Sequence, residues 1–319
     1  MLSSKEYYGY VNEHFVMKNK ALFRGCEENL LVARPMPDGF FDELLELLDR
    51  VQEKYEFDAQ KWCVPNYNKF ILWQEEFCGG CKKEALIAAT KLILFCCLVD
   101  RFLDSARFSA DEKEKICSKL HVEYFISEKE YKSDEFTELD ELINDVRIFL
   151  TDDTKVNQED REMIVTSMDK AFLSEIYMYK SPLKVAEAFD RSELEKLTDK
   201  SVEFEFACFL LASVNHNSER SRQAAACAGR IFWLADDLDD FVEDVNCKIK
   251  NSILFYCVDA PEEIRVQDRV EQAFANIDIF IERLEQEIAL FQRYVGGDLY
   301  RYMLNKVWEW CKDVRKHAE

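Results

Sequence analysis

Hydrophobic residues recur along most of this chain at the spacing of a helix rather than that of a strand. Asp38 is placed to cap a helix that carries Phe41, Leu44, Leu45 and Leu48 on one face. The same periodicity, interrupted at YKSPLK and DAPEE, predicts further helices. They are expected at about 83–104, 110–120, 135–151, 157–180, 192–214, 218–246, 262–294 and 298–316.

The predicted helix at 83–104 differs from the others because it is apolar on nearly every side. Such a helix is typical of the centre of a large bundle, where no face meets water. Only 8 Gly and 5 Pro interrupt the 319 residues, and strong helix formers fill the stretches between them. No repeat of fixed period and no Gly/Ser linker divides the chain. We therefore expect an all-α protein with a single large helical domain over residues 1–319.

The charge balance narrows the classes of ligand. With 42 basic and 63 acidic residues the formal charge is −21, which is unsuited to nucleic acid or anionic lipid because both require a basic face. An anionic ligand would need bound cations beside it. The 12 Cys, in a chain whose start does not read as a secretory leader, indicate reduced thiols in a cytoplasmic protein. The longest uncharged apolar run, residues 92–99, is much shorter than the roughly 20 residues of a membrane span, so no transmembrane segment is predicted.

Six carboxylates crowd into the end of the predicted helix at 218–246. In GRIFWLADDLDDFVED, Asp236, Asp240 and Asp244 follow one another at intervals of four residues, which places them on one face over successive turns. Asp237 stands beside this row. If the apolar residues before them are buried, unpaired carboxylates here would cost several kcal/mol each. The alternative is an exposed acidic face, because 63 of the 319 residues are acidic and most charge runs are solvated.

A second, smaller acidic pair ends the predicted helix at 83–104. Asp100 and Asp104 in LVDRFLD are again four residues apart, a spacing that on its own is common in so acidic a chain. Two apolar helices that both end in acids indicate one cavity with carboxylates on opposing walls. Because the ligands are all oxygen and no His or Cys is adjacent, we expect Mg²⁺, which completes its shell with water and substrate phosphate. More than one ion is expected.

FWLADDLDD resembles the second Asp-rich motif of the class I isoprenoid synthases, the superfamily of trans-prenyl diphosphate synthases, squalene-type synthases and class I terpene synthases. Asp236, Asp237 and Asp240 occupy the DDxxD places. Asp236, Asp240 and Asp244 also occupy the three ligand places of the terpene synthase NSE/DTE triad. The resemblance implies a helical bundle with a central active-site cavity, in which these residues hold Mg²⁺ against a prenyl diphosphate.

DRFLD is similar to the first motif of the same superfamily, although Arg101 stands where a second Asp usually does. That departure leaves Asp100 and Asp104 as the implied ligands and leaves the number of metal ions open. The resemblance covers roughly residues 91–256. Asp100, Asp104, Asp236 and Asp240 are the implied catalytic residues.

The resemblance also suggests residues that bind the substrate diphosphate. Lys200, in DKSVEFEFACFLLASV, matches the lysine-containing helix of the prenyl synthases. Arg191 lies near the place of the diphosphate-sensing Arg of terpene synthases, and Arg293 and Tyr294 in QRY resemble their C-terminal Arg-Tyr pair. Lys248 continues the acidic row by four residues, so it either reaches diphosphate or forms an ordinary helical ion pair.

Two features of chain elongation are missing from the sequence. It contains no GGKRxRP and no paired Arg directly after DRFLD, which elongating prenyltransferases use to hold isopentenyl diphosphate. The resemblance therefore implies an enzyme that ionises one allylic diphosphate and lets the carbocation cyclise or capture water in an apolar, aromatic pocket. A prenyltransferase, either chain-elongating or of the squalene-type head-to-head class, is one alternative. A catalytically silent binding member of the fold is the other. The family also suggests a homodimer.

Overall fold

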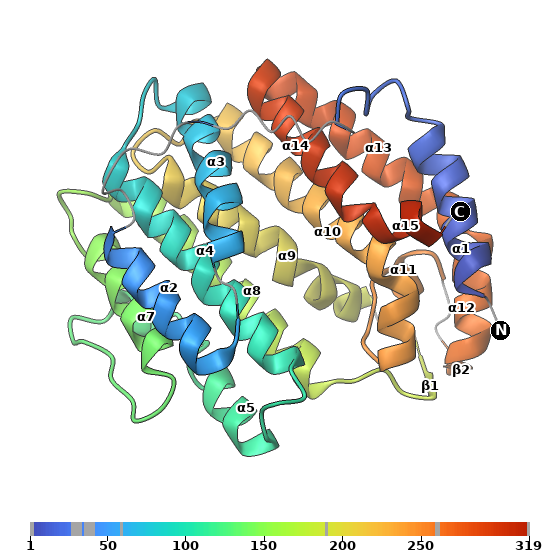
Figure 1. The fold of residues 1–319 in the computed structure, drawn as a ribbon, viewed down its shortest axis with the longest axis horizontal. Helices are drawn as coiled ribbons and strands as arrows, with labels where there is room; N and C mark the ends of the chain where they lie inside the picture. Colours follow the sequence, from blue (N-terminus) through green and yellow to red (C-terminus); the bar gives the residue numbers. More distant parts are fainter. Residues whose placement is uncertain are drawn as a thin grey trace. The chain divides into compact units, whose positions relative to one another are not determined.

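The computed structural model describes residues 3–26, 34, 42–57, 60–188, 191–258 and 262–317, which are almost entirely helical (Figure 1). The described α-helices are α1 Ser4–Val11, α2 Asp42–Tyr55, α3 Gln60–Phe77, α4 Lys83–Asp104, α5 Ala110–Cys117, α6 Glu123–Ile126, α7 Thr137–Leu150, α8 Gln158–Lys180, α9 Arg191–Ala212, α10 Glu219–Cys247, α11 Ile253–Tyr256, α12 Val266–Ala275, α13 Ile277–Tyr294, α14 Gly297–Trp310 and α15 Lys312–His317. A π-helix, η1 Asn12–Met17, follows α1, and two short strands, β1 Ala186–Glu187 and β2 Ile264–Arg265, pair antiparallel. The all-α class is confirmed. None of the described helices combines the length and hydropathy that a bilayer span requires.

Two predicted helices are interrupted in the structure. The segment expected at 262–294 contains β2 and then two helices, α12 and α13, which Asn276 separates. The Asn276 amide donates hydrogen bonds to the carbonyls of Gln272 (3.0 Å) and Cys257 (3.2 Å), and such side-chain bonds compete with the backbone bonds that would continue a helix. The segment expected at 298–316 is likewise divided at Cys311 into α14 and α15.

The contacts of the chain divide it into two compact units. The first comprises Met1–Leu31, Leu173–Phe204 and Ala226–Glu319, and the second comprises Val32–Phe172 and Glu205–Ala225. The single domain expected over residues 1–319 stays a prediction.

In the second unit, α4 is the buried helix that its apolar sequence predicted. It packs against α3, α5 and α7, and Leu86, Leu92, Phe95 and Leu98 are fully buried. The Nζ of Lys91, on the same helix, lies 2.5 Å from the Asp145 carboxylate on α7. A charge this well buried requires such a partner.

Helix α2 covers α7 with a different set of residues from the one we expected. Leu44, Leu47, Leu48 and Val51 are buried, at the i, i+3, i+4, i+7 spacing of an amphipathic helix. Leu45, expected on the buried face, is 41% exposed, so that part of the prediction is wrong. Asp38 and Phe41, the predicted cap and first apolar residue, lie outside the described residues.

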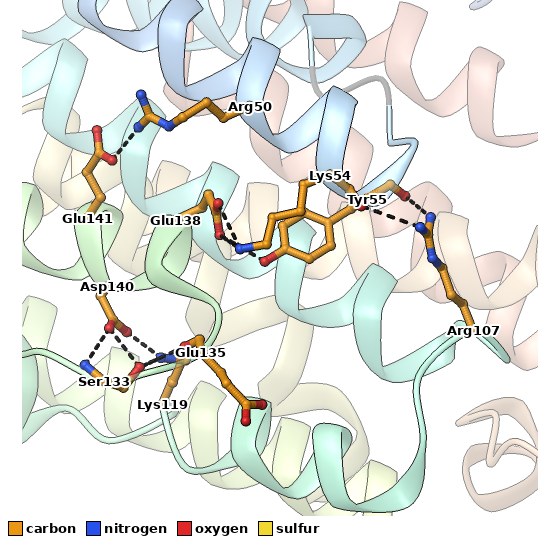
Figure 2. Close-up of polar contacts among 10 residues, drawn as sticks. All are labelled: Arg50, Lys54, Tyr55, Arg107, Lys119, Ser133, Glu135, Glu138, Asp140 and Glu141. Carbon is orange, nitrogen blue, oxygen red and sulfur yellow. Dashed lines mark hydrogen bonds and ion pairs between the residues drawn. The ribbon is translucent and has the colours of Figure 1, made fainter.

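Polar contacts fasten the end of α2 to α7 and to the loop after α4 (Figure 2). The carboxylate of Glu138 on α7 accepts hydrogen bonds from Lys54 Nζ (3.0 Å) and from the hydroxyl of Tyr55 (2.8 Å). Arg107 donates to the backbone carbonyl of Tyr55 at 2.9 Å. This guanidinium satisfies a carbonyl at the C-terminus of α2, where a positive charge is favourable.

In the first unit, α1 packs against α15, and α11, α12 and α13 pack on one another. The buried hydroxyl of Tyr7 on α1 donates to the carbonyl of Leu238 on α10 at 2.9 Å. Arg269 on α12 is fully buried, and its guanidinium donates to the carbonyl of Glu187 on β1 at 2.8 Å. These bonds hold α10 and the β1–β2 ribbon within this unit.

Candidate metal centre

The carboxylates of the first unit follow a buried stretch of α10 that lies unusually close to α9. Ile231, Leu234 and Ala235 are fully buried. A Cβ added to Gly229 would lie 2.6 Å from the carbonyl oxygen of Val202 on α9, closer than such atoms approach. The absence of a side chain at Gly229 therefore permits this backbone contact, which brings the start of the acidic segment towards α9.

The Asp237 carboxylate accepts several hydrogen bonds through one of its oxygens. Its Oδ2 accepts bonds from the indole N–H of Trp233 (2.9 Å), from the backbone N–H of Ser252 (3.1 Å) and from the Ser252 hydroxyl. Trp233 also donates to the Ser252 hydroxyl at 2.7 Å. Asp237 thus joins α10 to the segment between α10 and α11.

Asp244 lies two turns further along the same face of α10. Its Oδ2 accepts a hydrogen bond of 2.9 Å from the side-chain amide of Asn251. The same amide nitrogen donates to the carbonyl of Asp237, also at 2.9 Å. Asn251 therefore bridges the two turns that carry Asp237 and Asp244.

Asp240 lies between two groups of acids. A carboxylate oxygen of Asp240 comes within 4.8 Å of one from Asp239 and one from Asp313 at the start of α15, a grouping that could hold a metal ion. Asp239 accepts backbone hydrogen bonds from Val314 (2.9 Å) and Asp313 (3.3 Å), which satisfy N–H groups at the first turn of α15. Asp236 is exposed.

Burial perturbs the titration of these carboxylates. It raises the pKa of Asp237 to about 6, although hydrogen bonds from Ser252 and Trp233 counteract it. It raises the pKa of Asp244 to about 8, where the bond from Asn251 counteracts it and the neighbouring Asp237 and Asp240 add to it. Buried acids that repel one another are stabilised by a cation, and an all-oxygen donor set suits a hard ion such as Mg²⁺. Among the described residues, the acids whose oxygens lie close enough to share one ion are Asp239, Asp240 and Asp313, so of the predicted ligands only Asp240 belongs to that grouping.

Lys200 on α9 belongs to this group of charges. Its ammonium lowers the pKa of both Asp237 and Asp244, against the larger effect of burial. It also forms an ion pair of 3.1 Å with Glu175 on α8. Of the basic residues predicted for diphosphate, Lys200 is thus brought near the acids of α10.

Lys248 does not continue the helical row, contrary to the spacing argument. The α10 helix ends at Cys247, and Lys248 adopts a left-handed conformation with φ of 62°. The N–H of Ile249 bonds to the carbonyl of Asp244 (2.8 Å) and that of Lys248 to the carbonyl of Val245 (3.3 Å). This pair of bonds is the Schellman arrangement that closes a helix. The Lys248 side chain is exposed.

The other predicted diphosphate residues lie at helix ends in the same unit. Arg191 begins α9, but its side chain is outside the described part of the chain. Arg293 and Tyr294 close α13, and Arg293 is exposed. Among the described residues, neither Arg293 nor Tyr294 makes a hydrogen bond with the α10 acids.

The first acidic pair belongs to the second unit. Asp100 and Asp104 both lie on the last turns of α4, as their spacing requires, with Asp100 half-buried and Asp104 exposed. Arg101 between them is exposed. Phe102 is buried instead, with its ring 4.6 Å from that of Tyr55 and 5.1 Å from that of Phe108. This aromatic packing holds the end of α4 in a fixed rotation.

The second unit also contains a pocket of about 360 Å³ between α2, α4 and α7. It is lined by Asp42, Leu44, Glu46, Leu47, Arg50, Lys91, Glu141 and Asp145. Two ion pairs, Arg50 with Glu141 and Lys91 with Asp145, cross it, the first of which is visible in Figure 2. None of the predicted site residues lines this pocket.

No family model matches the chain, and no curated protein matches it. Among solved structures, the chain is similar to 2-methylisoborneol synthase from Streptomyces coelicolor A3(2) in complex with Mg²⁺ and geranyl-S-thiolodiphosphate. The two are 12% identical, and the match covers 91% of this chain and 94% of that chain with a TM-score of 0.49. It is also similar to linalool/nerolidol synthase from Streptomyces clavuligerus in complex with 2-fluorogeranyl diphosphate, with 13% identity and a TM-score of 0.46 over 90% of this chain and 100% of that one. Both are terpene synthases. A likeness of this degree leaves the reaction to be argued from the residues of the site.

Sequence reasoning missed Asn251, Ser252 and Trp233, which bond to the acids of α10. Asn and Ser are residues that often form local turns, and Asn251 and Ser252 follow the end of α10 at Cys247 after three intervening residues. That signal predicts a turn after α10, but it does not predict that the turn folds back onto Asp237 and Asp244.

Proposed function

We propose that this protein is a Mg²⁺-dependent enzyme of the class I terpene synthase type, a carbon–oxygen lyase that ionises an allylic prenyl diphosphate and lets the carbocation cyclise or react with water. The observation that carries the proposal is the end of α10, where buried, mutually repelling carboxylates share one helical face. Acids in that setting are neutralised either by a proton or by a bound cation. Cations held by them would in turn bind a diphosphate, which the charge of −21 would otherwise repel.

Two sets of acids are the proposed metal ligands. Asp236, Asp240 and Asp244 on α10 form the first, with Asp237 beside them. Asp100 and Asp104 on α4 form the second, and their service to the same ions is a prediction from the sequence. Bound Mg²⁺ would stabilise the negative charge that develops on the departing diphosphate.

The remaining proposed roles belong to basic and aromatic side chains. Lys200, near Asp237 and Asp244, is suited to bind a diphosphate oxygen beside the metal ligands. Arg191, Arg293 and Tyr294 are proposed as further diphosphate contacts from the sequence alone, whereas the helical spacing that suggested Lys248 is interrupted in the structure. Aromatic rings such as those among the 24 Phe, 13 Tyr and 5 Trp would exclude water and stabilise a cation through their π faces.

Turnover of defined substrates tests the proposal. The purified protein would be incubated with geranyl, farnesyl or geranylgeranyl diphosphate and Mg²⁺, with and without isopentenyl diphosphate. We expect released pyrophosphate and an extractable hydrocarbon or alcohol without isopentenyl diphosphate. Products that are longer prenyl diphosphates, or head-to-head coupled chains, would instead assign a prenyltransferase. No turnover under any condition would favour a catalytically silent binding protein.

Substitutions separate the proposed ligands from the surrounding charge. Asp240→Ala and Asp100→Ala should each abolish Mg²⁺-dependent turnover and leave helical content unchanged. Glu243→Ala is the matched control, because Glu243 is an exposed acid on the same helix and lies outside the proposed ligand set. Full activity in both aspartate variants would refute the site. A homodimer and a cytoplasmic location stay predictions, and sedimentation tests the first.

A further inference from the structure

The segment that follows α10 folds back onto the acidic face of that helix. After Lys248, residues 249–252 return towards α10, and Asn251 and Ser252 reach carboxylates that are two helical turns apart. Asn251 is fully buried and Ser252 is 1% exposed. Buried polar side chains are almost always hydrogen-bonded. In this segment the amide of Asn251 and the hydroxyl of Ser252 find their partners on the acidic residues of α10.

The Asn251 side chain uses both of its amide hydrogens and its oxygen. Its Nδ2 donates to the Asp237 carbonyl and to Asp244 Oδ2, each at 2.9 Å. Its Oδ1 accepts from the backbone N–H of Ile253 at 3.0 Å. Because an amide nitrogen carries two hydrogens, no rotation of Asn251 keeps these three bonds and moves Asp244. Asn251 therefore restrains the Oδ2 atom of Asp244.

Asp237 has a different environment from Asp244. Its Oδ2 accepts three hydrogen bonds, from Trp233, from the Ser252 N–H and from the Ser252 hydroxyl. An oxygen in this state has no lone pair left for a metal ion. Within the described residues, no hydrogen bond engages the Oδ1 atom of either Asp237 or Asp244. Asp237 therefore anchors the segment through Oδ2, and each of the two carboxylates keeps an Oδ1 that no hydrogen bond of the described residues engages.

Lys250 fixes the same segment from its other side. Its side chain is 3% exposed, and Nζ pairs with Glu193 near the start of α9 and with Glu187 on β1 at 3.3 Å. A buried lysine between two carboxylates is costly to displace. Asn251 and Ser252 are therefore presented to α10 by a segment that is tied down next to them in the chain.

We propose that Asn251 is a positioning residue of the metal centre, which holds Oδ2 of Asp244 and so leaves Oδ1 for a cation, while Asp237 anchors the segment that carries Asn251. The inference rests on the proposed function, because it assigns a cation to Asp244. It gives Asp237 a second part beside the metal ligation that the motif resemblance implies, because its Oδ2 anchors the segment while its Oδ1 is not hydrogen-bonded within the described part of the chain.

The test measures binding of Mg²⁺ in the presence of inorganic pyrophosphate by calorimetry, with the full-length protein. Asn251→Ala should weaken Mg²⁺ binding roughly 10–100-fold, the usual effect of removing a hydrogen-bond partner of a metal ligand. Asn251→Ser should also weaken Mg²⁺ binding. Because serine keeps a side-chain oxygen for the Ile253 N–H, this variant can form the turn even if the alanine variant does not fold. Asn276→Ala is the control, because the Asn276 amide also makes two backbone bonds in this unit and should stay within about twofold of wild type.

A purely structural role is distinguished by the response to excess Mg²⁺. If Asn251 positions a ligand, high Mg²⁺ should restore pyrophosphate release by Asn251→Ser, with a raised Mg²⁺ requirement and a nearly unchanged maximal rate. Wild-type Mg²⁺ binding by both folded Asn251 variants, or weakened turnover that excess Mg²⁺ does not restore, would overturn the inference and leave the proposed function standing. If the wild-type protein binds no Mg²⁺ with pyrophosphate, the proposed function and the inference both fall.

Discussion

Replacing Gly229 by alanine tests the close backbone contact between α10 and α9. The new Cβ would lie 2.6 Å from the carbonyl oxygen, 3.0 Å from the Cα and 3.2 Å from the carbonyl carbon of Val202. All three are backbone atoms, so no side-chain rotation relieves the overlap. The two helices must separate locally, and Lys200, two residues before Val202, must move with α9.

The size of the effect follows from two opposing contributions. Overpacking a well-packed core costs about 1–3 kcal/mol, and a clash with backbone atoms belongs at the upper end of that range. Alanine in place of glycine in a helix interior stabilises the folded protein by roughly 1 kcal/mol. We therefore expect Gly229→Ala to lower the free energy of unfolding by about 1–2 kcal/mol.

Urea unfolding, followed by circular dichroism, measures the change against a matched variant. Gly9→Ala lies inside α1, where a Cβ would meet no atom within 4 Å, so it should be stabilised by about 0.5–1 kcal/mol. Gly229→Ala should also weaken Mg²⁺ and pyrophosphate binding, since Lys200 is displaced. If Gly229→Ala is as stable as Gly9→Ala, the close contact of α9 and α10 is refuted.

Three further predictions concern single contacts and the cation. Burial opposes ionisation of Glu138, but hydrogen bonds from its own backbone, Lys54 and Tyr55 hold its pKa below its ordinary value. Urea unfolding should therefore find Glu138→Gln about 1 kcal/mol less stable at neutral pH, with the difference lost as the pH falls through that pKa. A difference independent of pH would contradict this. Lys248→Gly should have a free energy of unfolding about 1 kcal/mol higher than Lys248→Ala in urea, because only glycine adopts the left-handed backbone without strain. Equal stability would exclude strain at Lys248. Mg²⁺ with pyrophosphate at about 100 times the dissociation constant should raise the free energy of unfolding by about 2.7 kcal/mol. A chelator should reverse this stabilisation. An unchanged melting curve would refute cation binding by the folded state.

The helices were largely predictable because their signals are local. The apolar pattern of α4, and the acids that end α4 and α10, can be read from residues within a few turns of each other. The interruptions at Asn276 and Cys311 could not be predicted in this way. At Asn276 the break depends on a bond to the carbonyl of Cys257, which belongs to another part of the chain.

The spacing of the α10 acids was predictable, but the division of labour among them was not. Helical geometry treats Asp237 and Asp244 as neighbours on one face, whereas Ser252 and Asn251 give them different surroundings. Those contacts require the chain to reverse at Lys248, which adopts a left-handed conformation without being Gly or Asn. Asn251 and Ser252 predict a turn after α10, but no local signal predicts the left-handed Lys248 or the return onto the acids, so the partners of the acids emerge only from the folded chain.

If the acidic end of α10 binds divalent cations together with diphosphate, the ions should be visible beside its carboxylates in a crystal structure. Crystals grown with Mn²⁺ in place of Mg²⁺ and with pyrophosphate would locate the ions by anomalous scattering. We predict Mn²⁺ in contact with Asp240 and with Oδ1 of Asp244, and a pyrophosphate oxygen completing its shell. Well-ordered pyrophosphate with no Mn²⁺ at Asp240 or Asp244, or Mn²⁺ bound only elsewhere, would show that the acidic end of α10 is not the metal site.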